Sequence, residues 1–147
     1  HNLKISYTAK HCDVIARNLY RIYSSGGLRS VKRILFDDSR VDPAANNNHA
    51  ICWASLFGHS SLVEDLLKDE RVDPSANDNI ALRLASREGH VNVVRGLLKD
   101  SRVDPSAEDN SAIRGACARG HVDVVKKLLS DSRVDPSARN NYAIRLA

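Results

Sequence analysis

The chain has 147 residues, of which 42% are hydrophobic and 27% charged, as expected for one modest globular domain. Its net charge of +4 suggests a nucleic-acid binder, but basic and acidic residues alternate, so we expect no nucleic-acid partner. No apolar run approaches the ~18 residues that a membrane span requires, so we expect no membrane contact.

The N-terminal segment predicts a lead-in over residues 1–8 and then two helices, from Thr8 to Ser24 and from Leu28 to Phe36. Gly27 separates the two helices. The register of this segment fits the units that follow it, although its first helix is longer and carries larger apolar residues. We therefore interpret residues 1–39 as an N-terminal capping unit, whose outer side has no neighbour.

From residue 40 onward the sequence repeats with a period of 31 residues. Val-Asp-Pro begins at positions 41, 72, 103 and 134, and two consecutive units share 20 of 31 residues. Such self-similarity is typical of a solenoid. Full units are assigned to residues 40–70, 71–101 and 102–132, and a partial unit to residues 133–147. Because the partial unit lacks its second helix, we expect the natural chain to continue.

Within one unit, a turn rich in Asp, Asn and Pro leads into a first helix predicted over about Ile80–Glu88. Asn79 is predicted to cap this helix by accepting a backbone N–H bond. Gly89 is expected to end it in a left-handed conformation. Ala81 and Ala85 recur in the other units, so neighbouring first helices should approach closely.

A second helix is predicted over about Val91–Lys99. Its apolar stripe consists of Val93, Val94, Leu97 and Leu98. Two helices of about ten residues cannot bury a core alone, so the units must stack on one another. An Arg and an Asp recur side by side at the end of each unit, and stacking should align them into ladders of opposite charge.

Gly89 to Leu98 reads GHVNVVRGLL and resembles the second helix of the ankyrin repeat, while Val103-Asp104 resembles the extended arm of that repeat. The chain departs from the family pattern where Ile80 to Arg83 replaces Thr-Pro-Leu-His, and its period is 31 rather than 33. The resemblance covers residues 19–147. It implies an all-α, ankyrin-type helical repeat solenoid with short inter-repeat turns, in which first helices and hairpin tips line a concave groove.

Residues that could carry chemistry show no functional spacing. Cys12, Cys52 and Cys117 lack zinc-type spacing, which indicates free thiols and an intracellular, cytoplasmic location. His59, His90 and His121 recur every 31 residues, and the ~10 Å expected between units exceeds the reach of one zinc ion. The resemblance implies that these histidines fix the loop between helices. We therefore expect no enzyme, no catalytic residue, no metal and no cofactor.

Positions that differ between units are free to serve a partner. Phe57 is expected to be exposed and, with Leu56, to anchor a partner protein, or else to pack against Tyr23 or the N-terminal helix. Trp53 is expected to pack in the core, because its counterparts are apolar. The candidate partner-binding residues are Asn46, His49, Leu56, Phe57, Asn77, Ile80, Arg87, Glu108, Ser111, Arg139 and Tyr142.

Three functions are consistent with this sequence. The first is a protein–protein interaction scaffold that binds a partner through its concave face and hairpin tips. The second is a self-assembling structural protein, in which units stack end to end between chains. The third is the targeting arm of a larger adaptor. Molecular size across a concentration series separates the second function from the others.

Overall fold

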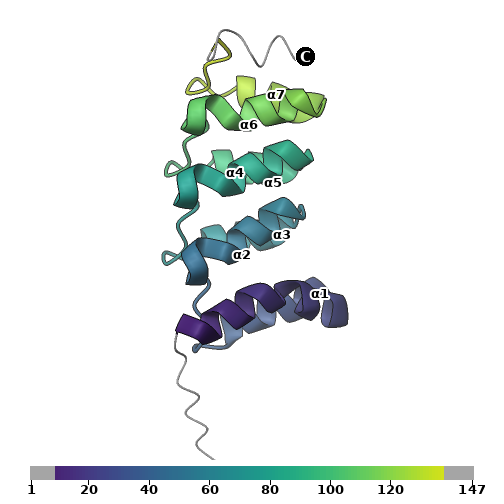
Figure 1. The fold of residues 1–147 in the computed structure, drawn as a ribbon, viewed down its shortest axis with the longest axis vertical. Helices are drawn as coiled ribbons and strands as arrows, with labels where there is room; N and C mark the ends of the chain where they lie inside the picture. Colours follow the sequence, from purple (N-terminus) through teal and green to yellow (C-terminus); the bar gives the residue numbers. More distant parts are fainter. Residues whose placement is uncertain (1–8, 138–147) are drawn as a thin grey trace, which may run out of the picture.

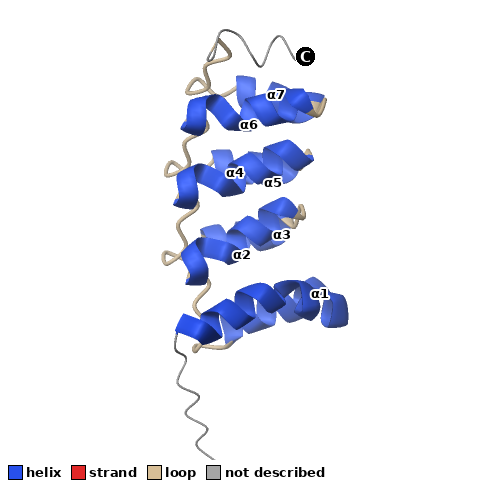
Figure 2. Cartoon of the chain, in the orientation of Figure 1, coloured by secondary structure: helices blue, strands red, loops and turns tan. Residues whose placement is uncertain are grey.

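The computed structural model describes residues 9–137, with side chains from Asn18 onward. Over residues 9–137 the chain forms helices and no strand, which confirms the predicted all-α class (Figure 2). The helices are α1 (Ala9–Asp37), α2 (Ala45–Leu56), α3 (Ser60–Leu67), α4 (Ala76–Glu88), α5 (Val91–Leu98), α6 (Ala107–Ala118) and α7 (Val122–Leu129).

The helices form antiparallel pairs that pile up in one column (Figure 1). Within the pairs, α2 contacts α3, α4 contacts α5, and α6 contacts α7. Between pairs, α1, α2, α4 and α6 form a column of first helices, and α3, α5 and α7 form a second column. The predicted solenoid is confirmed. Contacts therefore run mainly between sequence neighbours, as expected for a repeat array.

The core lies between successive pairs. Ala81 and Ala85 are 1% and 0% exposed, so their small side chains let α4 approach its neighbours closely. On α5, Val93, Val94 and Leu97 are buried, whereas Leu98, expected in the same stripe, is only half-buried. The apolar side chains of one pair are thus covered by the next pair, which compensates for the small core of each unit.

The two helices predicted at the N-terminus are joined into the single element α1, and Gly27 interrupts it with φ 66° and ψ −170°. The predicted break is therefore at the right residue, although no separate loop forms there. Gly58, Gly89 and Gly120 follow the other first helices with φ between 73° and 80°. Glycine adopts this conformation without the steric cost that a Cβ brings, and the predicted left-handed end of α4 at Gly89 is confirmed.

Each later first helix opens with a left-handed turn of three residues. In α4 these are Asn77, Asp78 and Asn79, with φ of 53°, 54° and 58°, and right-handed geometry begins at Ile80 as predicted. Left-handed backbone costs most residues about 1–2 kcal/mol each, and Asn and Asp tolerate it best. The composition of this turn therefore follows from its backbone.

The prediction that Asn79 caps its own helix was wrong. Asn79 Oδ1 instead accepts a hydrogen bond from the backbone N–H of Asp104 in the next unit, at 2.8 Å. Asn48 and Asn110 accept the same bond from Asp73 and Asp135, at 2.7 and 2.9 Å. These buried asparagines are therefore ties between units, and they satisfy a backbone donor that would otherwise lack an acceptor.

The recurring Arg and Asp also act as ties. Arg102 pairs with Asp100 of its own turn at 2.7 Å, and its Nη1 donates to the carbonyl oxygen of Val72 in the previous unit at 2.8 Å. Arg133 makes the corresponding bonds to Asp131 and Val103. Each Arg–Asp ion pair lies within a single turn and does not connect two units. The connection between units is made instead by the hydrogen bonds from arginine to a backbone carbonyl.

These arginines predict acid sensitivity. Hydrogen bonds from Arg71, Arg102 and Arg133 hold the pKa of Asp69, Asp100 and Asp131 below its ordinary value of about 3.9. A carboxyl with a lowered folded pKa stabilises the fold fully above its unfolded pKa, and this stabilisation is lost as the pH falls through the folded pKa. We expect the urea concentration at the unfolding midpoint to decrease as the pH falls below about 4. The triple variant with Asn at positions 69, 100 and 131 should have a lower midpoint at pH 7, and its midpoint should decrease less between about pH 4 and lower pH.

Asp123→Asn is the control for this titration, because Asp123 is exposed on α7 and has no ion pair among the described residues. It should lower the urea midpoint at pH 7 much less than the triple variant does. An unchanged acid limb in the triple variant would contradict the assignment.

Candidate partner-binding surface

The candidate residues at the tips lie in the left-handed turns. Asn46, Asn77 and Glu108 are each the first left-handed residue of α2, α4 and α6, and all three are exposed. Asn77 Oδ1 also accepts a hydrogen bond from Asn47 Nδ2 of the previous unit. The turns line one edge of the column (Figure 1). Arg139 and Tyr142, predicted to continue this surface, lie outside the described residues.

The next candidates are the first right-handed residues of α2, α4 and α6, which directly follow the left-handed turns. His49, Ile80 and Ser111 are half-buried, and burial lowers the pKa of His49. Leu56, Phe57 and Arg87 lie at the opposite, C-terminal ends of α2 and α4, with Phe57 directly after the last residue of α2. At about 1.5 Å per residue, a nine-residue helix separates the two groups by roughly 14 Å. The predicted residues therefore form two clusters rather than one.

The second cluster is built on aromatic rings. Phe57 is 47% exposed, and its ring centroid lies 6.4 Å from that of Tyr20 and 5.5 Å from that of Trp53. Tyr23 lies 5.9 Å from Trp53 and 4.8 Å from His59. We call Tyr20, Tyr23, Trp53, Phe57 and His59 the aromatic patch. Trp53 is buried, as predicted, and supports the exposed rings.

Phe57 is exposed, as expected, and it also packs against Tyr20 of α1, while its role as an anchor for a partner stays a prediction. Tyr20, at 61% exposed, was missed by the sequence reasoning. Its counterpart one period later is the buried Ile51, so its register gave no sign of exposure. Tyr23 carried a clearer signal, because it stands where the next unit has the fully buried Ala54. A tyrosine ring is too large for such a buried space, and that of Tyr23 is 37% exposed and contacts Trp53 and His59.

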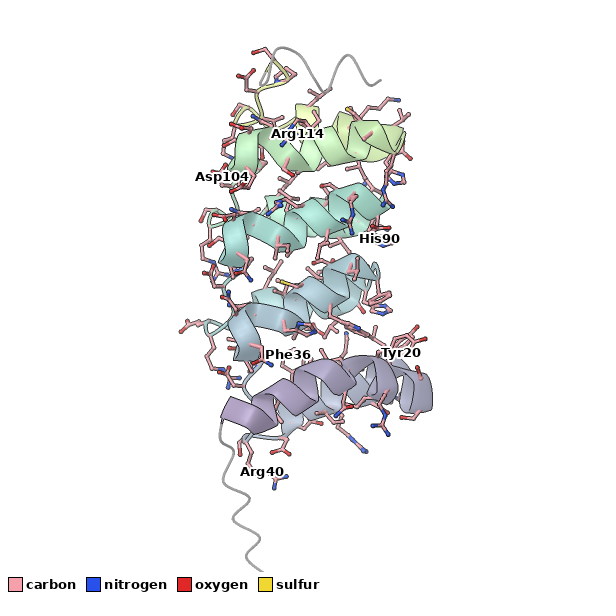
Figure 3. The ribbon with its side chains drawn as sticks, in the orientation of Figure 1. Tyr20, Phe36, Arg40, His90, Asp104 and Arg114 are labelled. Atoms are coloured by element: carbon pink, nitrogen blue, oxygen red, sulfur yellow. The ribbon has the colours of Figure 1, made fainter. Side chains whose placement is uncertain are left out.

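The recurring histidines tie the loops together. His90 Nε2 lies 2.9 Å from the carbonyl oxygen of Leu56, and His121 Nε2 lies 2.9 Å from that of Arg87. The carbonyl can only accept, so Nε2 carries the proton. His59 instead packs its ring against Tyr23 and Trp53, and its pKa is lowered by burial and by the charge of His90. Figure 3 shows Tyr20 and His90 at this end of the helices and Asp104 at the opposite edge.

An arginine-rich group lies at the C-terminal ends of α4 and α6. Glu88 accepts from Arg87 at 2.9 Å and from Arg119 at 3.2 Å, and these contacts hold its pKa below the ordinary value, with the Arg87 hydrogen bond the largest cause. Two guanidinium groups thus share one carboxylate. This group of two arginines and one glutamate carries a net positive charge.

The cysteines with described side chains show no activated thiol. Burial raises the pKa of Cys52 to about 11 and also raises that of Cys117, so both stay protonated at neutral pH. Among the residues with described side chains, no three His, Cys, Asp or Glu gather in a way that could hold a metal ion. Over the same part of the chain, no helix is long and apolar enough to cross a membrane.

Comparison with known proteins identifies the repeat. A family profile described as "Ankyrin repeats (3 copies)" matches residues 19–109 and again residues 51–140. No curated protein matches the chain. Ankyrin repeats generally act as protein–protein interaction modules, and the family is typically non-enzymatic. The two matches span most of the sequence, and their helix pairs are those of the stack in Figure 1, so the chain belongs to the ankyrin repeat family.

Proposed function

We propose that this array is a non-enzymatic scaffold that binds a partner protein along its column of first helices. The observation that carries the proposal is the aromatic patch, where Tyr20, Tyr23 and Phe57 are 61%, 37% and 47% exposed while contacting one another or the buried Trp53. Large exposed rings that rest on a buried indole are typical of an anchor for a partner, because they bury much area at low entropic cost.

The two clusters set the extent of the bound partner. A partner that reaches from Phe57 to the turn at Asn77 must cross the first-helix face, over the half-buried His49 and Ile80. In this proposal the patch supplies affinity, with Leu56 beside it. The polar tips Asn77 and Glu108, with Arg139 and Tyr142 beyond the described residues, select the partner. Arg87 favours a carboxylate on the partner, next to the group that covers Phe57.

Phe57→Asp tests this proposal. The substitution places a charge where the partner's apolar group would be buried, so affinity should fall at least 10-fold, the usual loss at a binding hot spot. The measurement is quantitative capture of proteins from the native cell extract, followed by affinity measurement for the captured partner. Circular dichroism should show unchanged helicity, since the side chain is nearly half exposed.

Val122→Asp is the matched control. Val122 is 59% exposed on α7, away from the aromatic patch, so the same charge is added to an apolar site that is at least as exposed as Phe57. Its affinity should equal that of the parent chain. Equal binding by Phe57→Asp and the parent would refute the anchor.

A further inference from the structure

Gly96 is an unexplained glycine in the interior of α5. In the part of the chain that the structure describes, no atom lies within 4 Å of a Cβ added there, and its φ is not positive, unlike that of Gly89. Neither a turn nor close packing therefore requires glycine at this position. Glycine inside a helix also destabilises it relative to alanine. No packing or backbone requirement among the described residues explains Gly96, so the space above it is open to a partner.

That space is part of a groove of about 320 Å³ between α3 and α5. The half-buried Leu67 gives the groove an apolar side, and Lys68 and Lys99 border it. Glu64 and Asp100 complete the lining, but Asp100 is already paired with Arg102. The groove thus combines an apolar wall, a bare backbone and two lysines, of which Lys68 also pairs with Asp65 at 3.5 Å and Lys99 has no ion pair among the described residues.

The positive charge continues onto the neighbouring helix. Arg95, Lys126 and Lys127 line a second groove of about 390 Å³ between α5 and α7, together with Val91. Arg95 of α5 is one turn from Lys99, the residue that directly follows this helix, and both are exposed. Among the described residues no ion pair joins Arg95, Lys99 or Lys126 to a carboxylate. We call Leu67, Lys68, Arg95, Gly96, Lys99, Lys126 and Lys127 the basic groove.

We propose that the basic groove binds an acidic, partly apolar segment of another protein, with the backbone of that segment seated over Gly96. Its carboxylates pair with Lys99 and Arg95, and an apolar side chain covers Leu67. Glu64 and Asp123 interrupt the positive charge, which disfavours a uniform polyanion such as nucleic acid. This site lies on the second column of helices and is independent of the aromatic patch.

Fluorescence anisotropy tests the proposal, with a fluorescein-labelled 12-residue peptide of alternating Leu and Asp as the probe and the 147-residue chain as the receptor. The parent should bind the probe more weakly as salt is added. Gly96→Leu fills the groove and Lys99→Glu reverses one charge, so each should weaken binding at least 10-fold. Gly96→Ala should raise the melting temperature by a few degrees, which separates the groove from a folding defect.

Arg33→Glu is the matched control, because Arg33 is exposed at the position of α1 that corresponds to Arg95. It changes the net charge as Lys99→Glu does and should leave binding within twofold. An equal loss in the two variants would show only general attraction and overturn the proposal. Unchanged binding by both Gly96→Leu and Lys99→Glu would also overturn it. The proposal would likewise fail if labelled duplex DNA bound more tightly than the peptide and both variants weakened DNA binding to the same extent.

Discussion

Gly89→Ala is expected to destabilise the fold by about 3–5 kcal/mol, and Gly120→Ala by only about 1–2 kcal/mol. Both glycines end a first helix with positive φ, 80° and 73°, so both substitutions incur the cost of a left-handed alanine. At Gly89 the new Cβ would also lie 2.6 Å from His121 Nδ1, whereas at Gly120 no atom of the described residues lies within 4 Å. The imidazole must move, and its hydrogen bond to the carbonyl of Arg87 is lost.

Urea unfolding of the two variants measures the difference directly. Gly58→Ala provides a repeat of the experiment, because its Cβ would lie 2.7 Å from His90 Nδ1. It should resemble Gly89→Ala. If all three variants lose the same stability, the histidine contact contributes nothing, and only the backbone conformation matters.

Asn79→Ala is expected to destabilise the fold by about 2–4 kcal/mol. The substitution leaves the N–H of Asp104 without its acceptor, which costs about 1–3 kcal/mol when the donor is withdrawn from water. It also places alanine in a left-handed conformation, at about 1 kcal/mol or more. Asn79→Asp keeps an oxygen acceptor and a tolerant residue, so its cost should stay near 1 kcal/mol.

Asp78→Ala is the control for the backbone term, because Asp78 has nearly the same φ, 54°, and an exposed side chain. Thermal and urea unfolding should place it between the parent and Asn79→Ala. Equal losses for Asp78→Ala and Asn79→Ala would exclude the tie to Asp104 as a source of stability.

Periodicity alone was sufficient to predict the helix pairs, because spacing of apolar residues reports which side of a helix is covered. The role of Asn79 could not be predicted in this way. A helix cap and a tie to the next unit need the same side-chain oxygen at the same position, and only the distance to Asp104 distinguishes them. Local sequence thus fixed the residue type, while the stacking distance determined its partner.

The candidate site was less predictable than the fold. Phe57 stood out because its counterparts are polar or glycine, and Tyr20 did not, because exposure depends on what lies beside it rather than on its own register. Gly96 was visible as a glycine in a helix. The reason for a glycine at this position depends on the neighbouring helices. A glycine that lines an open groove and a glycine that permits a tight helix contact cannot be distinguished from the sequence alone.

The ties between units have a consequence for how such a protein can change in length. Asn48 reaches residue 73, and Asn79 reaches residue 104, always the same distance along the chain. Excision of residues 71–101 would bring Asp104 to the place of Asp73 and His121 to the place of His90. Their hydrogen bonds would then be accepted by Asn48 Oδ1 and by the carbonyl oxygen of Leu56. Loss or duplication of a whole unit in the gene therefore leaves every hydrogen bond between units intact. The length of the array can change while each contact between neighbouring units stays the same.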